Sequence, residues 1–481
     1  MKNAAPLAAD LTPGPTVAHP LLVGDWPDPT VCRGPDAYYM THGCGPYQPS
    51  ALIWRSPDLF EWTPIAHAVS NQIGMAWVGD IDFYQGRFYL YCSVARQHCV
   101  VHAEDPTGPW SEPIPLLAPL FDIGHIADET GARYLFNAGG KRIRLTDNGL
   151  AVAGELEKVH DAWPIPADWS IECECLEAPR LVKRGEWYHM IAAEGGTFGP
   201  ATAHMAVVAR ARSLDGPWEN APHNPFIHTY SRSEAWWTKG HGNLIEGPDG
   251  RWWCIFHGHR AHHTSLSRCT LIEPVEWTAD EWPYVPPEWP QDAPAARVNL
   301  ELSDDFTAPT LGLQWQFHED ASTDRYELAG ESLTLTARGA EAHSSQPLCL
   351  KPRDESYVIE AELEVLGSAT GGMMLFAAPD FSCGLELTGA GTIRRVWNGM
   401  RQYRWAHEVP YPSRRITFRF INRHEDVAFQ YRDEGGSWRT LQPGQDVGRL
   451  GDTTNGSRVA LFAHGEGAVR FLRFEYRGLE P

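Results

Sequence analysis

One short sequence phrase recurs five times in the first 290 residues of this 481-residue chain. Each copy has a turn residue or two, then a pair of aromatic or aromatic-like positions, and then an apolar stretch. The copies are Asp36-Ala-Tyr-Tyr-Met, Gly86-Arg-Phe-Tyr-Leu, Gly131-Ala-Arg-Tyr-Leu, Gly185-Glu-Trp-Tyr-His and Gly250-Arg-Trp-Trp-Cys. Their second aromatics are Tyr39, Tyr89, Tyr134, Tyr188 and Trp253, at spacings of 50, 45, 54 and 65 residues. A turn and a strand repeating about every 40–50 residues are typical of β-propeller blades, so the sequence predicts five blades.

The pattern changes after the fifth copy. A proline-rich passage follows Glu273-Pro-Val-Glu-Trp, and proline stiffens exposed connections between domains. Beyond Asp304, segments such as Ile359-Glu-Ala-Glu-Leu-Glu-Val and Arg415-Ile-Thr-Phe-Arg-Phe alternate apolar and polar residues, as strands of an antiparallel sandwich do. The prediction is an all-β chain with a flexible leader at 1–18, a five-bladed β-propeller at 19–290 and a concanavalin-like β-sandwich at 300–481.

The net charge and the hydropathy of the chain limit the classes of partner that it can bind. The formal net charge of −21 argues against nucleic acid and anionic membranes, which need a basic surface, and fits a neutral substrate. No apolar stretch is long enough for a membrane span. Residues 1–19 lack the basic and apolar regions of a secretory signal, so we expect a cytoplasmic protein with its ten cysteines as free thiols.

Three carboxylates stand at equivalent places in different blades. Asp28 lies between two prolines ahead of the first blade strand, Asp122 lies ahead of the third copy of the phrase, and Glu177 lies ahead of the fourth. Taken singly, each is better explained as a turn residue. Because the innermost strands of a propeller line its axis, three carboxylates at their starts indicate one shared site.

These residues carry a resemblance to glycoside hydrolase family 43, in its branch of β-xylosidases and α-L-arabinofuranosidases with a C-terminal sandwich. Pro27-Asp-Pro-Thr resembles the turn of the general base, and Glu177-Ala-Pro-Arg-Leu-Val-Lys resembles the segment of the general acid. The segment from Asp122 to Leu135 matches the one whose carboxylate orients that acid and tunes its pKa. The resemblance implies Asp28 as base, Glu177 as acid and Asp122 as the tuning group of an inverting enzyme.

The same resemblance implies a substrate and further site residues. It implies exo-acting release of terminal xylose, arabinofuranose or both from xylan- or arabinan-derived oligosaccharides or aryl glycosides, with the sandwich closing one end of the cleft. Gly240-His-Gly-Asn-Leu resembles the motif that places His241 at the axis, often beside a structural calcium ion. Ser267-Arg-Cys-Thr resembles the segment whose arginine, here Arg268, contacts the sugar. Trp77 and Phe121 are candidates for a sugar-stacking wall, and no cofactor is required for the chemistry.

Departures from the family pattern leave the preferred sugar open. Ile123-Gly stands for Pro-Ser after Asp122, Ala178 for Gly after Glu177, and Cys269 for Glu after Arg268. Xylose, arabinofuranose and a rarer furanoside all remain candidates, and the oligomeric state is open.

Two other functions compete. One is a retaining, fructosidase-like propeller hydrolase with Glu172-Cys or Glu174-Cys as its acid, although the chain has no Arg-Asp-Pro stabiliser motif. The other is a glycan-binding propeller without catalysis, against which the presence of all three carboxylates argues.

Overall fold

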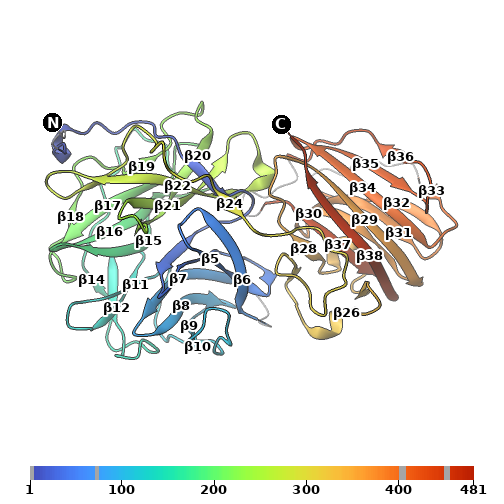
Figure 1. The fold of residues 1–481 in the computed structure, drawn as a ribbon, viewed down its shortest axis with the longest axis horizontal. Coiled ribbons are helices and arrows are strands. Elements are labelled where there is room, and N and C mark those ends of the chain that lie inside the picture. The colour runs from blue at the N-terminus through green and yellow to red at the C-terminus, as the bar shows by residue number, and fades with distance from the viewer. Residues whose placement is uncertain (1–4, 71–74, 400–407, 449–455, 481) are drawn as a thin grey trace.

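The computed structural model of the chain describes residues 5–70, 75–399, 408–448 and 456–480. Apart from four short 3₁₀ helices, its regular elements are β-strands, arranged as a propeller and a sandwich (Figure 1). The all-β prediction, with five blades and a C-terminal sandwich, is confirmed. No helix in the described ranges has the length and apolar character to span a membrane.

Each of the first four blades is an antiparallel sheet that starts with its innermost strand, and in blade 4 two short strands, β18 and β19, both pair with β17. Blade 1 contains β2 (Thr30–Arg33), β3 (Tyr38–Thr41), β5 (Ser50–Ser56) and β6 (Glu61–Val69), and blade 2 contains β7 (Ala76–Tyr84), β8 (Arg87–Val94), β9 (Gln97–Ala103) and β10 (Ile114–Pro115). Blade 3 contains β11 (Gly124–Ala127), β12 (Arg133–Asn137), β13 (Lys141–Arg144) and β14 (Glu157–Lys158). Blade 4 contains β15 (Cys173–Arg184), β16 (Trp187–Gly195), β17 (Met205–Ala211), β18 (Glu219–Asn220) and β19 (Ile227–His228).

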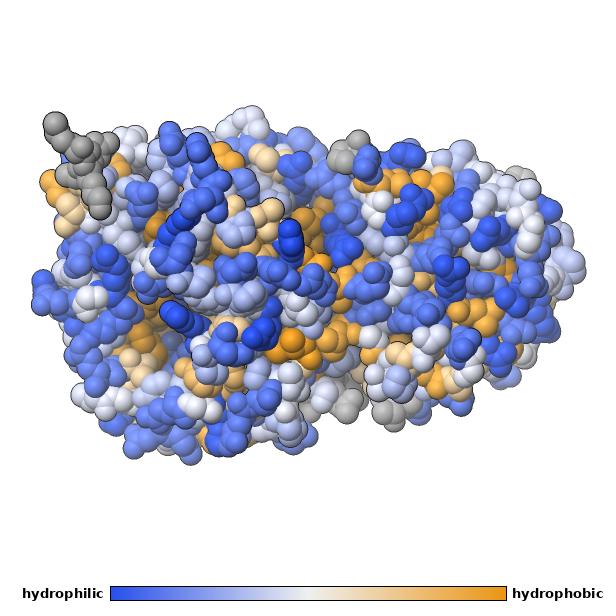
Figure 2. Space-filling model, viewed as in Figure 1, coloured by the Kyte–Doolittle hydropathy of each residue, from blue (hydrophilic) through white to orange (hydrophobic). Residues whose placement is uncertain are grey.

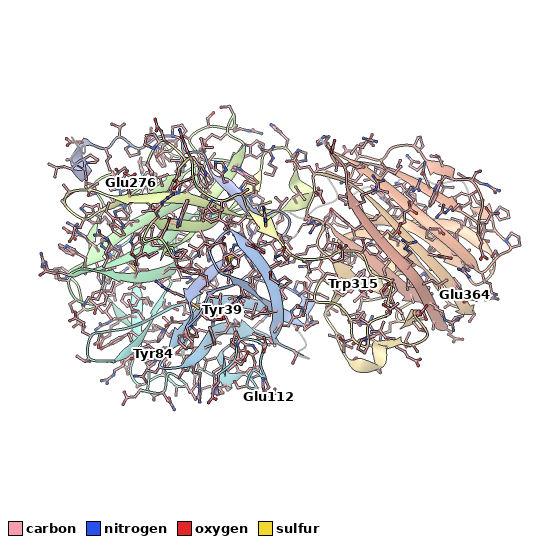
Figure 3. All side chains as sticks on the ribbon, viewed as in Figure 1. Tyr39, Tyr84, Glu112, Glu276, Trp315 and Glu364 are labelled. Carbon is pink, nitrogen blue, oxygen red and sulfur yellow. A yellow bond between two sulfur atoms is a disulfide. The ribbon has the colours of Figure 1, made fainter. Side chains whose placement is uncertain are left out.

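Blade 5 closes the ring. It contains β20 (Trp236–Glu246), β21 (Trp252–Arg260), β22 (Arg268–Trp277) and β23 (Pro283–Tyr284), and its outer partner is β1 (His19–Leu22) from the start of the chain. The repeated phrase falls on the second strand of every blade: β3, β8, β12, β16 and β21. Four of its five second aromatics, Tyr39, Tyr89, Tyr188 and Trp253, are buried, and Tyr134 is partly buried. These side chains fill the spaces between neighbouring blades, and Figure 3 marks Tyr39 within the propeller.

The sandwich has one sheet of eight strands and one of seven. The first contains β33 (Val409–Pro410), β32 (Thr392–Asn398), β31 (Phe381–Thr388), β30 (Thr370–Ala378), β37 (Arg458–His464), β28 (Leu348–Leu350), β25 (Gln316–His318) and β4 (Tyr47–Gln48). The second contains β26 (Tyr326–Leu328), β27 (Leu333–Thr336), β38 (Gly467–Gly478), β29 (Ser356–Gly367), β34 (Arg415–Arg423), β35 (Asp426–Arg432) and β36 (Arg439–Gln442). The alternating residues predicted to face inward, such as Ile359 and Phe418, lie in one apolar core between the sheets.

The two domains share strands. β4 comes from the propeller sequence but pairs with β25 at the edge of the eight-stranded sheet, and β24 (Arg297–Val298) of the connection pairs in parallel with β6 of blade 1. The buried Arg458 of the sandwich lies over the ring of Tyr47 and donates to Gln316 (2.8 Å), and it lies 3.4 Å from Asp25 of the propeller. Strand pairing and buried side chains therefore join the two domains at their interface.

The prediction of a flexible leader at residues 1–18 needs correction for residues 5–18, which the structure describes. Residues 5–18 contain the short helix η1 (Ala8–Asp10) and lie along blade 5 (Figure 1). The backbone N–H of Ala8 donates to Asp280 (3.1 Å), and the Thr16 hydroxyl donates to the buried Glu273 (2.6 Å). Ala8 itself is buried in an apolar core that blades 4 and 5 share, so these residues are part of the propeller.

A second correction concerns the cysteines. Cys173 and Cys175, at the start of β15, form a disulfide, whereas the other eight cysteines are free, as expected, and are all buried. The other 3₁₀ helices are η2 (Thr264–Leu266), η3 (Thr323–Arg325) and η4 (Ala342–Ser344). The face of the molecule in Figure 2 is mostly hydrophilic, with apolar residues in separate small patches over both domains.

Candidate active site

A cavity of about 390 Å³ opens where the five blades meet, and every blade contributes to its lining. All seven residues singled out in the sequence line it: Asp28, Trp77, Phe121, Asp122, Glu177, His241 and Arg268. Asp28 and Asp122 each stand two residues before an innermost strand, β2 and β11. Glu177 and His241 lie within the innermost strands β15 and β20, where the pairing register with the next strand shifts.

The backbone around these side chains is strained. Asp28, Asp122 and His241 have φ angles of 54°, 45° and 59°, and Ala178, directly after Glu177, has 49°. Non-glycine residues in this left-handed region cost energy, and they persist where the fold uses them to aim a side chain. Four such positions around one cavity indicate that the blades are bent to present these groups to it.

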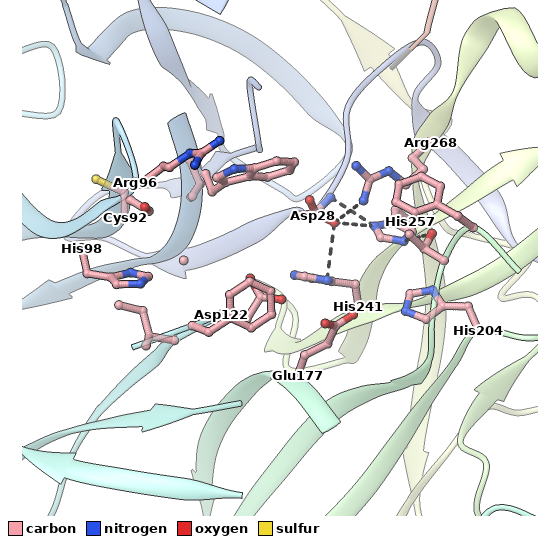
Figure 4. A pocket seen from close by; sticks show the side chains of 18 residues that line it. Asp28, Cys92, Arg96, His98, Asp122, Glu177, His204, His241, His257 and Arg268 are labelled. Atoms are coloured by element: carbon pink, nitrogen blue, oxygen red, sulfur yellow. Dashed lines mark hydrogen bonds and ion pairs between the residues drawn. The ribbon is translucent and has the colours of Figure 1, made fainter. Parts of the chain in front are cut away.

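Asp28 is held in its ionised form. Its Oδ1 lies 2.7 Å from Nη1 of Arg268, 3.2 Å from Nδ1 of His257 and 3.5 Å from Nδ1 of His241 (Figure 4). Burial opposes ionisation of Asp28, but Arg268 and then the two histidines outweigh it, so the pKa of this carboxyl lies well below its ordinary value. Because Oδ1 takes all three of these contacts with described residues, Oδ2 is the oxygen available to a water molecule.

The pKa values of Glu177 and Asp122 are instead raised above their ordinary values. Burial, then the neighbouring charges of Asp122 and Asp28, raises the pKa of Glu177 to about 8. Burial and the charge of Asp28 raise the pKa of Asp122 to about 7. Two carboxyls that interact this strongly titrate as a pair, so the pair retains a proton near neutral pH. The cavity thus holds the ionised carboxylate of Asp28 and, in the Glu177–Asp122 pair, a protonated carboxyl group, the combination that acid–base catalysis needs.

Three exposed aromatic rings line the same cavity. Among the large hydrophobic residues that the described part of the chain exposes, the aromatic ones are Trp77 (38%), Phe121 (58%) and Phe198 (37%). Trp77 and Phe121 were expected there from the sequence, whereas Phe198 was not. Exposed aromatic rings gathered at one cavity indicate a ligand with apolar faces, such as a sugar ring.

Sequence reasoning missed several residues behind the carboxylates. The buried rings of His204, His257 and His241 stack in succession, with centroids 5.1 and 5.4 Å apart. His257 also accepts the backbone N–H of Asp28 at Nδ1 (3.1 Å), and its Nε2 lies 3.2 Å from the hydroxyl of Thr197. His241 was expected from the sequence, but His257 lies in the second strand of blade 5, and His204 and Thr197 lie in loops, where no motif marks them.

Arg180 was also missed, although it lies in the segment that supplies Glu177. It is buried, donates to the carbonyl oxygens of Ile123 (3.0 Å) and Gly79, and lies 3.6 Å from Asp80. These contacts join the inner strands of blades 2, 3 and 4 directly below the cavity.

The side chains near His241 differ from the ligands that the expected calcium ion prefers. Asp28, His241 and His257 place three potential ligand atoms within 4.8 Å of one another. Calcium prefers six to eight oxygen ligands, whereas two of these atoms are imidazole nitrogens and the single carboxylate oxygen already pairs with Arg268. The three side chains therefore do not fit direct calcium coordination, and the calcium ion stays a prediction on which nothing below depends.

The acids of the fructosidase-like alternative lie elsewhere. Glu172 and Glu174 are exposed and do not line the cavity, and Glu172 instead accepts the backbone N–H of Phe198 (2.6 Å). The residues that line the cavity in the described part of the chain all belong to the propeller. The expectation that the sandwich closes one end of the cleft therefore finds no support among them.

An ionised carboxylate and a protonated carboxyl group that line one cavity at the propeller axis are the groups that hydrolysis of a glycosidic bond requires, so fold and site indicate a propeller-type glycoside hydrolase. Residues 17–283 match the model of glycosyl hydrolases family 43, and residues 303–477 match that of the β-xylosidase C-terminal concanavalin A-like domain. The chain belongs to glycosyl hydrolases family 43.

Curated relatives and solved structures agree with this assignment. The chain is 26% identical to a non-reducing end α-L-arabinofuranosidase of Bacteroides ovatus, over 73% of this chain and 70% of that protein. It is 28% identical to a xylan 1,3-β-xylosidase of a Vibrio species, over 67% of this chain and 69% of that protein. A family 43 protein from Bacillus licheniformis shares the fold with a TM-score of 0.86 at 24% identity, covering 97% of this chain and all of that one.

Proposed function

We propose that this glycosidase is an inverting, exo-acting enzyme that releases terminal xylose, arabinofuranose or both from xylan- or arabinan-derived oligosaccharides. The observation that carries the proposal is that Asp28, Asp122 and Glu177 line one cavity at the propeller axis. Their surroundings push two pKa values apart, below the ordinary range for Asp28 and to about 8 for Glu177. The names of its relatives, an arabinofuranosidase and a xylosidase, support the choice of pentose.

The roles of the carboxyl groups follow from their protonation states. Asp28 accepts a proton through Oδ2 from a water molecule that attacks the anomeric carbon. Glu177 gives its proton to the leaving glycosidic oxygen as that bond breaks, and Asp122 keeps the pKa of Glu177 high. Attack by water from the face opposite the leaving group inverts the anomeric configuration. Trp77, Phe121 and Phe198 provide apolar surfaces for the sugar ring.

The size of the cavity supports a small substrate. At about 390 Å³ it is near the lower end of the 300–1,000 Å³ that is typical of ligand pockets. We therefore place one terminal sugar in the cavity, with the rest of the oligosaccharide extending outward from its mouth.

The test is a panel of aryl glycosides that carry xylose, arabinofuranose or other pentoses, with the first-formed anomer followed by NMR. Inversion on a xyloside or arabinofuranoside supports the proposal, and retention of configuration overturns it. Asp28→Ala should lower the rate by about 10²–10⁴-fold on every substrate because no other group activates the water. A glycan-binding protein without catalysis would have no rate to lose.

A further inference from the structure

Three metal-ligating side chains from distant parts of the sequence meet at the boundary of the two domains. His263 lies in the loop between β21 and β22 of blade 5, Glu355 lies just before β29, and His424 lies in the turn between β34 and β35. Nε2 of His263 is 3.2 Å from Oε2 of Glu355, and Nδ1 of His424 is 3.9 Å from the same oxygen. All three ligand atoms lie within 4.8 Å of one another.

We propose that His263, Glu355 and His424 bind a divalent transition metal ion of the zinc type, which joins blade 5 to the sandwich. Two imidazole nitrogens and one carboxylate oxygen suit zinc and its neighbours, whereas calcium and magnesium prefer oxygen ligands alone. Three protein ligands leave the fourth tetrahedral position for water.

The distances fit this ion after a small movement of one ligand. Zinc binds imidazole nitrogen and carboxylate oxygen at about 2.0–2.2 Å, so its tetrahedral ligands lie roughly 3.3–3.5 Å apart. The His263–Glu355 pair, at 3.2 Å, is already close to that spacing. The His424 side chain is 54% exposed and stands on a turn, so it has room to close the remaining distance.

Neighbouring groups orient the ligands. Nε of Arg260 donates to Oε1 of Glu355 (2.6 Å), which fixes the carboxylate and leaves Oε2 for the ion. The backbone N–H of Ser265 donates to Glu425 (2.6 Å), whose negative charge lies near His263 and offsets that of Arg260. Hydrogen-bonded supports of this kind are typical of metal sites.

An ion bound at this site would stabilise the folded chain and hold the loop before Arg268 in place. His263, Glu355 and His424 do not line the catalytic cavity. His263 is five residues before Arg268, which contacts Asp28 at 2.7 Å. An ion at His263 would therefore fasten this loop to the sandwich without touching the substrate.

The experiment uses full-length protein freed of metal by dialysis against a chelator. Zinc chloride is titrated by calorimetry, and thermal unfolding is recorded with and without zinc. We expect saturable zinc binding and a melting temperature raised by roughly 2–4 °C. In His424→Ala the stoichiometry should fall by one ion per chain, or the affinity of that ion should fall at least tenfold, and the zinc-dependent shift should disappear.

A matched control is His343→Ala, because His343 also lies beside a glutamate on the sandwich surface (3.3 Å from Glu341) and should bind no zinc. Since His424 is exposed, its variant should fold, and Glu355→Gln provides a second variant that keeps the shape of the side chain. Zinc binding that is the same in wild type and His424→Ala would show that His424 is not a ligand and would overturn the proposal. Binding that is lost only in His241→Ala would place the ion in the catalytic cavity, with the same consequence. Absence of binding up to millimolar zinc would overturn it as well.

Discussion

Arg268 and Asp28 join the two ends of the propeller sequence at its axis. Nη1 of Arg268, the first residue of β22, lies 2.7 Å from Oδ1 of Asp28, which precedes β2. The pair links blade 5, the last blade, to blade 1. It also sets the protonation state of Asp28, because this guanidinium is the strongest influence that keeps the buried carboxylate ionised.

Replacing Arg268 should move the whole pH profile of activity upward. Without its positive charge the pKa of Asp28 rises, so the acidic limb of kcat/KM moves to higher pH. Arg268 also lowers the pKa values of Glu177 and Asp122, so the alkaline limb of Arg268→Ala should move in the same direction. Loss of a charge-assisted hydrogen bond should lower kcat/KM by roughly 10- to 100-fold. Arg96→Ala, another arginine of the cavity lining, is the control that should leave both limbs in place.

Glu177→Ala should depend strongly on the leaving group. Dinitrophenol needs little protonation to depart, so its glycosides should lose far less rate than natural xylosides or arabinosides. Rates across aryl leaving groups of graded pKa provide the measurement. Glu174→Ala is the matched control, because this glutamate is exposed and lies outside the cavity. Equal losses for all leaving groups would remove Glu177 from the role of acid.

Asp122→Asn should lower the alkaline limit of activity. The charge of Asp122 helps to raise the pKa of Glu177 to about 8, so its removal lets Glu177 lose its proton at lower pH. The alkaline limb should move down, with KM nearly unchanged. Glu172→Gln should move the limb in the same direction but less, because Glu172 is the weakest of the negative neighbours acting on Glu177. An unchanged alkaline limb in Asp122→Asn would contradict this account.

Much of this site was predictable because the repeated phrase gave the blade order and so placed the carboxylates at the axis. The histidines behind Asp28 were not predictable, since His257 lies in a strand whose pattern is that of any blade. The packing of residues 5–18 was also hidden, because their partners, such as Asp280, lie more than 250 residues away. The same distance hid the pairing of β4 with β25. Local patterns do not encode such long-range contacts.

Gly43→Ala should slow the reaction without unfolding the protein. A Cβ at position 43 would stand 3.2 Å from Oδ2 of Asp28, the oxygen assigned to the attacking water. The crowded carboxylate must shift by a few tenths of an ångström, which should lower kcat more than it changes KM. Gly154→Ala is a control, since the nearest atom to a Cβ there is 3.9 Å away. Wild-type kcat in Gly43→Ala would show that the water binds elsewhere.

Arg458→Met should destabilise both domains together. Arg458 is buried and faces Asp25 of the propeller (3.4 Å), so its loss leaves a buried carboxylate without its cation. Breaking such a pair costs about 3–5 kcal/mol, whereas replacing both charged partners is often far less costly. Thermal or denaturant unfolding should therefore show a large loss in Arg458→Met and a partial recovery in Arg458→Met with Asp25→Asn. Because β4 and Asp25 tie the propeller to the sandwich, both domains should lose stability in the single variant. A loss confined to the sandwich transition would mean that the shared strand does not couple the two folds.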